Sequence, residues 1–262
     1  MLIIHVGAHK TGTTTIQNFL KKEPVILKNS SINYIDIYKD VGAGLVSKLQ
    51  PEDDLYLKMR VLYSVRDKID RNYEDDKVNI ISSESFFGDF YQAYKNQKYI
   101  YSILSEVFSG YSLRVAYLER DISDFFTSLY IQSVQQGRCW SEKKYFELTG
   151  INNFSWDEAY TNAISCFGED RVIRIKMEDA SRHEYGLIGG FFKEIGCELN
   201  SSMIESNEEL KKYNKNISYG RKEVMLARVF NKLTFSKFNK YIRILLARLT
   251  LATNSKKYLS KL

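Results

Sequence analysis

The stretch LIIHVGAHKTGTTTIQNFLKK, residues 2–22, decides the fold. It opens with a short apolar run, residues 2–6, which has the composition of a buried β-strand and is ended by Gly7. A loop rich in glycine and threonine follows, and TTIQNFLKK at residues 14–22 has the apolar spacing of a helix. A strand, a loop and a helix are therefore contiguous at the start of the chain, which favours an α/β protein.

Short apolar segments alternate with amphipathic segments along the rest of the chain. The pattern predicts strands at residues 78–83, 113–118 and 171–175, and helices at residues 52–73, 98–108, 157–167 and 185–195, with one more helix after Arg120. Strands separated by helices favour a parallel sheet with helices on both faces. Ligands of such sheets bind beyond the carboxyl ends of the strands, so the residues that follow each strand are the candidates for a site.

The loop after the first strand has the features of an anion-binding site. Gly7 and Gly12 permit a tight backbone turn, and the helix that follows points its free N–H groups at the loop. Thr13 and Thr14 add hydroxyl donors, and Lys10 adds a positive charge. Kinase-type P-loops place a lysine directly after the last glycine, whereas Thr13 stands there in this chain. A turn that only caps the helix would have a similar composition.

Lys10-Thr11-Gly12-Thr13-Thr14 resembles the Lys-(Ser/Thr)-Gly-Thr-(Thr/Ser) loop of the sulfotransferases that use 3′-phosphoadenosine 5′-phosphosulfate (PAPS). The resemblance implies a P-loop-type fold in which this loop and Thr15 bind the cofactor. It also implies that Lys10 stabilises the charge on the leaving oxygen, with no metal ion required. The soluble small-molecule members carry a tryptophan at the position of Thr15, which favours the carbohydrate-type and bacterial branch and leaves Trp140, Trp156 and the tyrosines as candidates for contact with adenine.

A second part of the resemblance lies after the third predicted strand. Family members have an arginine there and a serine eight residues later, and both contact the 3′-phosphate of PAPS and of its product, 3′-phosphoadenosine 5′-phosphate (PAP). Arg120 and Ser128 have this spacing, which is slightly more than two helical turns. The planar arginine fork suits a phosphate, although a salt bridge between Arg120 and Asp121 would give the same local sequence. Arg221 and Lys222, preceded by residues 216–218, resemble a late basic segment that closes over this phosphate.

Glu84 is the candidate for the base that removes a proton from the acceptor. It ends the predicted strand 78–83 and is expected to lie near the first loop, and a strand-terminal glutamate in this role resembles the carbohydrate sulfotransferases. A carboxylate that only stabilises the start of the next helix would occupy the same position. His9, beside Lys10, is the second candidate for the base, whereas His5 is expected to be structural.

The composition fits an ordinary globular protein, with 262 residues of which 44% are hydrophobic and 27% charged. We expect a PAPS-binding domain at residues 1–210 and a basic helical segment at residues 211–262 packed on it. The three cysteines are too widely spaced for a disulfide framework or a CxxC-type zinc site. With no signal-peptide pattern and no apolar run long enough for a membrane span, we expect a cytoplasmic protein.

The formal net charge of +6 favours acidic partners, and many basic residues follow Lys211. Solvated helix faces explain these residues better than nucleic-acid binding does, and peripheral contact with a membrane is a further hypothesis. The resemblance to the PAPS-dependent family implies in-line sulfuryl transfer from PAPS to a hydroxyl or amine of an acceptor, which we expect to be a carbohydrate or glycolipid. Two alternatives stay open: a kinase-like ATP-dependent transferase in which Asp121 holds magnesium, and a non-catalytic protein that binds nucleotides or a membrane surface.

Overall fold

The computed structural model describes residues 1–38, 46–51, 55–200, 202, 204, 210, 212, 213 and 219–233. Contacts between residues divide the chain into two compact units. The described residues of 1–121 and 153–214 form the first unit, and those of 122–152 and 215–262 form the second. The domain boundary expected at residue 210 stays a prediction.

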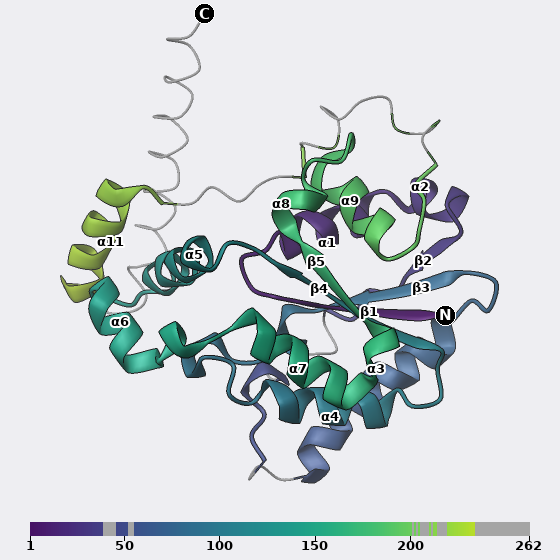
Figure 1. Cartoon of the computed structure of the whole chain (residues 1–262), viewed down its shortest axis with the longest axis horizontal. Helices are drawn as coiled ribbons and strands as arrows, with labels where there is room; N and C mark the ends of the chain where they lie inside the picture. The colour runs from purple at the N-terminus through teal and green to yellow at the C-terminus, as the bar shows by residue number, and fades with distance from the viewer. Residues whose placement is uncertain are drawn as a thin grey trace, which may run out of the picture. The chain divides into compact units, whose positions relative to one another are not determined.

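The first unit is built on a five-stranded parallel sheet (Figure 1). Its strands are β1 (Leu2–Gly7), β2 (Ile32–Tyr34), β3 (Val78–Ser82), β4 (Leu113–Glu119) and β5 (Val172–Lys176), in the spatial order β2-β3-β1-β4-β5. The predicted α/β class with a parallel sheet is confirmed. Because the strands are parallel and β1 lies between β3 and β4, the loops that follow these three strands begin side by side at the same edge of the sheet.

Helices cover both faces of this sheet, as Figure 1 shows. One face carries α1 (Thr13–Lys22), α2 (Pro24–Asn29), α8 (Met177–Ala180) and α9 (Gly186–Glu194), and the other carries α3 (Leu55–Asn72), α4 (Gln97–Val107) and α7 (Trp156–Phe167). Alternate strand residues serve the two faces: Leu118 packs with Phe191 of α9 in one core, whereas the ring of Tyr117 meets Trp156 of α7 in the other. The central strands are thus buried on both sides.

Short 3₁₀ turns fill the connections. They are η1 (Val46–Lys48), η2 (Glu84–Phe86), η3 (Phe90–Gln92), η4 (Ile151–Asn153) and η5 (Glu169–Arg171). Two of them, η2 and η3, follow β3, and η2 packs against β1.

The second unit contains three described helices, α5 (Ile122–Gln135), α6 (Glu142–Thr149) and α11 (Arg221–Leu233). The helix expected after Arg120 is α5, and α11 is a helix within the predicted basic segment. Most of that segment, residues 216–218 among it, lies outside the described residues. Within the part of the chain that the structure describes, no helix is long and apolar enough to cross a bilayer.

Candidate active site

The loop between β1 and α1 is closed by hydrogen bonds to one backbone carbonyl. The buried hydroxyls of Thr11 and Thr13 both donate to the Ala8 oxygen, at 2.8 and 3.0 Å. Gly12 precedes α1 with a φ of 90°, where a residue with a side chain would be strained. An added Cβ there would also lie 2.3 Å from Leu187 Cδ2. The turn is therefore fixed, and position 12 requires glycine.

The start of α1 offers backbone donors to an anion. The first N–H groups of a helix have no partner within it, and the helix dipole makes this end positive. No side chain caps α1, and its first turn contains no acidic residue. Thr14 is exposed there, whereas Thr15 is buried. Together with the partly buried Lys10, this end of α1 can hold a phosphate-like group.

Glu84, directly after β3, lies beside the same loop. A Cβ built on Gly7 would be 3.5 Å from the Cα atom of Glu84. Burial raises the pKa of Glu84 to about 7, against the opposing effect of the Lys10 charge. Burial also lowers the pKa of Lys10, an effect that the charge of Glu84 opposes and that of Arg120 reinforces. An acid and a base at a sheet edge whose charges interact and whose pKa values are perturbed are typical of an active site.

A capping role does not account for Glu84. The element that follows it, η2, is a single 3₁₀ turn of three residues rather than a helix with an appreciable dipole. The side chain of Ser83 caps this turn, because its hydroxyl accepts the N–H of Ser85 at 3.3 Å. The carboxylate of Glu84 is thus available for another function.

Arg120 reaches the loop from the other side, directly after β4. Its Nη1 atom donates to the Lys10 carbonyl at 3.3 Å. The main chain of Arg120 is held in turn by Trp156, whose indole Nε1 donates to the Arg120 carbonyl at 2.9 Å. Trp156 is only 8% exposed, and its ring stacks on Tyr117. Trp156, a candidate for contact with adenine, is therefore packed in the core.

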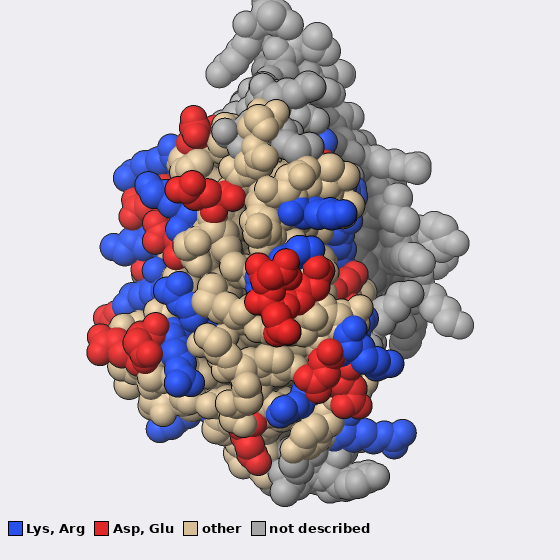
Figure 2. Space-filling view, turned by 90° about the vertical axis from the view of Figure 1, so that its right-hand side faces the viewer, with Lys and Arg blue, Asp and Glu red and all other residues tan. Residues whose placement is uncertain are grey.

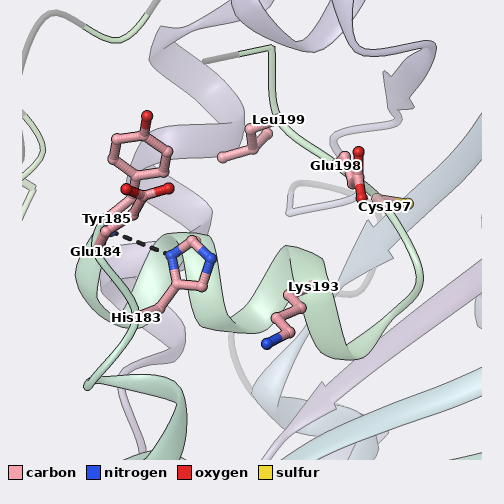
Figure 3. A pocket seen from close by; sticks show the side chains of 8 residues that line it. His183, Glu184, Tyr185, Lys193, Cys197, Glu198 and Leu199 are labelled. Atoms are coloured by element: carbon pink, nitrogen blue, oxygen red, sulfur yellow. Dashed lines mark hydrogen bonds between the residues drawn. The ribbon is translucent and has the colours of Figure 1, made fainter.

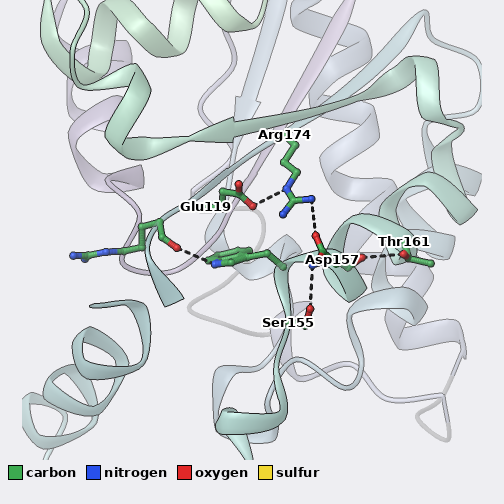
Figure 4. Close-up of polar contacts among 7 residues, drawn as sticks. Glu119, Ser155, Asp157, Thr161 and Arg174 are labelled. Carbon is green, nitrogen blue, oxygen red and sulfur yellow. Dashed lines mark hydrogen bonds and ion pairs between the residues drawn. The ribbon is translucent and has the colours of Figure 1, made fainter. Parts of the chain in front are cut away.

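A network of ion pairs stabilises the end of β4 behind Arg120 (Figure 4). Arg174 of β5 donates to the buried Glu119, the last residue of β4, at 2.6 Å, and to Asp157 of α7 at 2.9 Å. Burial alone would lower the pKa of Arg174, but the hydrogen bonds to both carboxylates raise it. Two strands and a helix are thereby joined next to the site. No local sequence pattern predicts this network, because its members lie far apart along the chain.

The two histidines near the loop are both buried and neutral at physiological pH. Burial, reinforced by the Lys10 charge, lowers the pKa of His9 to about 4, and its Nδ1 atom lies 3.3 Å from the Tyr94 hydroxyl. Burial lowers the pKa of His5 to about 3, and its Nδ1 atom lies 2.9 Å from the Ser82 hydroxyl. Glu84 is better matched than His9 to accept a proton near pH 7.

Three predicted cofactor contacts belong to the second unit. Ser128 is half-buried on α5, and Arg221 and Lys222 are exposed at the start of α11. Their approach to the loop of the first unit stays a prediction. Trp140, also in this unit, lies 4.8 Å from the guanidinium of Arg138 and remains a candidate for contact with adenine.

A cavity of about 350 Å³ beside α9 contains none of the predicted site residues (Figure 3). Its lining includes His183, Lys193, Cys197 and Glu198. Burial raises the pKa of the Cys197 thiol to about 11, so it is a poor nucleophile at neutral pH. Among the described residues, no group of three or more histidine, cysteine or acidic side chains is arranged to hold a metal ion.

Comparisons with known proteins give little beyond a similarity of shape. No protein-family model and no curated protein matches the chain. A sulfotransferase from Alicyclobacillus acidocaldarius aligns over 87% of this chain and 92% of its own, with 14% identity and a TM-score of 0.47. Retinol dehydratase in complex with androsterone and the inactive cofactor PAP aligns over 95% of this chain and 80% of its own, with 13% identity and a TM-score of 0.40. Neither similarity assigns an activity to this chain.

Proposed function

We propose that the protein is a sulfotransferase, which moves a sulfuryl group from PAPS to a hydroxyl or amine of an acceptor, a carbohydrate or a glycolipid. The observation that carries the proposal is the meeting of Lys10, Glu84 and Arg120 at one edge of the sheet. They follow three neighbouring parallel strands and surround the start of α1. An anion site, two cations and a carboxylate with a pKa near 7 are the groups that transfer from an anionic donor to a hydroxyl requires.

The residues at this edge fit a donor that carries two phosphates. The start of α1, with Lys10, Thr11, Gly12, Thr13, Thr14 and Thr15 around it, would hold the 5′-phosphosulfate. The Thr13 hydroxyl donates its proton to Ala8, so the donors for this group would be backbone N–H groups, Thr14 and Lys10. Arg120 would bind the 3′-phosphate, together with Ser128, Arg221 and Lys222. PAPS supplies a sulfuryl group on a phosphate that leaves readily.

The protein's own groups then have separate tasks. Glu84 in its carboxylate form accepts the proton of the acceptor hydroxyl as that oxygen attacks. The Lys10 ammonium stabilises the negative charge that develops on the leaving oxygen, and this interaction is stronger in the transition state than before it. His9 is neutral and hydrogen-bonded to Tyr94, which suits a role in shaping the loop.

Binding of PAP and of AMP, which differ only in the 3′-phosphate, tests the proposal by calorimetry. PAP should bind at least about 30-fold more tightly, because one charge-assisted contact is worth roughly 2 to 3 kcal/mol. Arg120→Ala should remove most of that difference. Equal affinity for the two nucleotides, or transfer of phosphate from ATP by the purified protein, would reject a sulfotransferase and favour the kinase-like alternative.

The acceptor class needs its own experiment. Transfer of radiolabelled sulfate from PAPS should be measured on a panel of glycans, glycolipids and phenols. Labelled glycans or glycolipids would support the proposed acceptor. If only phenols are labelled, the protein would still be a sulfotransferase, but the proposed acceptor class would be wrong.

A further inference from the structure

Polar side chains attach α11 to the rest of its unit. Asn231 donates from Nδ2 to the carbonyls of Val134 and Arg138, at 2.9 Å in each case. Arg228 donates from Nε to the Cys139 carbonyl at 3.4 Å. These carbonyls lie at or just beyond the end of α5, where helical carbonyls lack partners within the helix. The contact face of α11 thus combines these hydrogen bonds with the buried Ala227, and it stabilises the end of α5.

Four large apolar side chains of α11 lie on the opposite face and are exposed, whereas the small Ala227 is buried. An ordinary surface helix turns its apolar stripe toward the core. In α11 the exposed fractions are 63% for Met225, 47% for Leu226, 49% for Val229 and 37% for Phe230. Spacings of one, four and five residues place these four side chains on one face of the helix. The helix is therefore amphipathic in the reverse sense, with its apolar face outward.

Basic residues accompany this face and give it a strong charge. Arg221 and Lys222 are exposed on α11, and so is Lys232. Residues 221–262 contain 11 Lys or Arg and a single acidic residue, Glu223, whereas the other 220 residues contain 27 Lys or Arg and 31 Asp or Glu. On the face drawn in Figure 2, basic and acidic side chains are interspersed. The positive charge of the chain therefore arises from its last 42 residues.

We propose that α11 binds the surface of an anionic lipid bilayer, with Met225, Leu226, Val229 and Phe230 in the interface and Lys232 on phosphate head groups. Apolar side chains flanked by lysine and arginine are what such surfaces bind. A second copy of α11, or residues 234–262 of the same chain, would bring basic residues against basic residues, because none of these segments contains a further acidic residue. A nucleic acid would leave the apolar face exposed to water.

Co-sedimentation of the full chain with vesicles tests the proposal. Vesicles of phosphatidylcholine with about one third phosphatidylglycerol should bind the protein, whereas vesicles of pure phosphatidylcholine should bind it at least about tenfold more weakly. Leu226→Glu and Phe230→Glu should each lower the partition coefficient by about tenfold or more, because burial of one large apolar side chain is worth roughly that factor. Raising the salt from about 0.1 to 0.5 M should release the wild type.

Leu148→Glu is the matched control, since Leu148 is an exposed leucine on α6 of the same unit. This variant should bind the anionic vesicles like the wild type. Circular dichroism should show all three variants folded, because the substituted side chains are exposed. No binding of the wild type to anionic vesicles would overturn the proposal, and so would equal binding by Leu226→Glu and Phe230→Glu, which would assign the interaction to residues 234–262.

Discussion

Lys10 and Arg174 are both basic residues near the carboxyl edge of one parallel sheet, and each lies close to a carboxylate. Arg174 has its pKa raised, because two carboxylates bind it and outweigh the effect of burial. Lys10 has its pKa lowered, because burial and Arg120 outweigh the attraction of Glu84. In the first arrangement, Arg174 with its two carboxylates, the charges are well stabilised. In the second arrangement, Lys10 with Glu84, they are poorly stabilised. We expect structural ion pairs to resemble that of Arg174. Residues that must gain or lose charge during a reaction are expected to resemble Lys10 and Glu84.

Of the substitutions considered, Glu84→Gln, which changes the second arrangement, should have the largest effect on turnover. The amide keeps the size of the side chain and cannot accept a proton, so turnover should fall by roughly 10²- to 10⁴-fold while PAP binding is retained. Initial rates and calorimetry on one preparation measure both. Asp89→Asn is the control, because Asp89 is a half-buried acid in the same segment that caps η3 and should leave turnover within a few fold. If Glu84→Gln is fully active, the role of general base would be assigned to His9 instead.

The pKa of Glu84 also predicts two opposite pH dependences. As the base must be deprotonated, kcat/KM of the wild type should rise with pH through about 7. The stability of the fold should fall over the same pH range. The pKa of Glu84 is higher in the folded protein than its usual 4.5, so the folded state loses stability as the pH rises through about 7. At pH 8 Glu84→Gln should therefore be more stable than the wild type, by about 1 to 3 kcal/mol in urea unfolding. An equal or lower stability would contradict the proposed desolvation.

Lys10→Ala should lower kcat by roughly 10²- to 10³-fold and weaken PAP binding much less. Its interaction grows as the leaving oxygen gains charge, and PAP lacks the transferring group. The comparison of kcat with the dissociation constant of PAP measures this difference. Lys22→Ala, on the last turn of α1, should leave both unchanged. Equal losses in kcat and in PAP affinity would make Lys10 a binding residue only.

Arg174→Met tests the satisfied arrangement, and stability is the readout. Glu119 would remain as a buried carboxylate without its main partner, so the free energy of unfolding should fall by about 2 to 4 kcal/mol. Asp157→Asn removes the other carboxylate from the same arginine, but 86% of the Asp157 side chain is exposed, and the loss should stay below about 1 kcal/mol. Urea unfolding of both variants gives the two values. Similar losses would mean that burial does not distinguish the two pairs.

Much of the fold could be predicted from the sequence because the central strands carry a continuous apolar signal. β1, β3 and β4 are buried on both faces, and their apolar runs located them. β2 was not predicted, because it has three residues at the edge of the sheet and contains Asn33. The short helices α2 and α8, of six and four residues, were missed for the same reason of length.

The candidate site could be predicted in part, since strand ends in a parallel sheet converge. That rule directed attention to the residues after each strand, and the resemblance of the loop and of Arg120 to the family motifs then selected Lys10, Glu84 and Arg120 without knowledge of the strand order. It could not give the side chains that support them. Trp156 lies 36 residues beyond Arg120 and bonds its carbonyl from another element, and no periodicity in a sequence records such a contact. The role of Ser128 stays a prediction, because Ser128 belongs to the second unit.

Trp156→Phe should have the smallest effect and test whether the core positions Arg120. Phenylalanine can keep part of the packing on Tyr117, but it is smaller and lacks the N–H that bonds the Arg120 carbonyl. A neutral hydrogen bond contributes about 1 kcal/mol, so PAP affinity should fall by roughly three- to tenfold. The affinity for AMP, which lacks the 3′-phosphate, should stay within about twofold, since the guanidinium then has no phosphate to bind.

Trp140→Phe provides the control for this comparison, because the Tyr130 hydroxyl bonds the backbone carbonyl of Trp140 and not its indole. It should leave the ratio of PAP to AMP affinity unchanged. Thermal melts must accompany the calorimetry, since a core substitution also lowers stability. If Trp156→Phe weakens PAP and AMP equally, the tryptophan supports the unit as a whole. A loss confined to PAP would show that the Trp156 hydrogen bond holds Arg120 in register with the loop, because only the 3′-phosphate contact depends on that arginine.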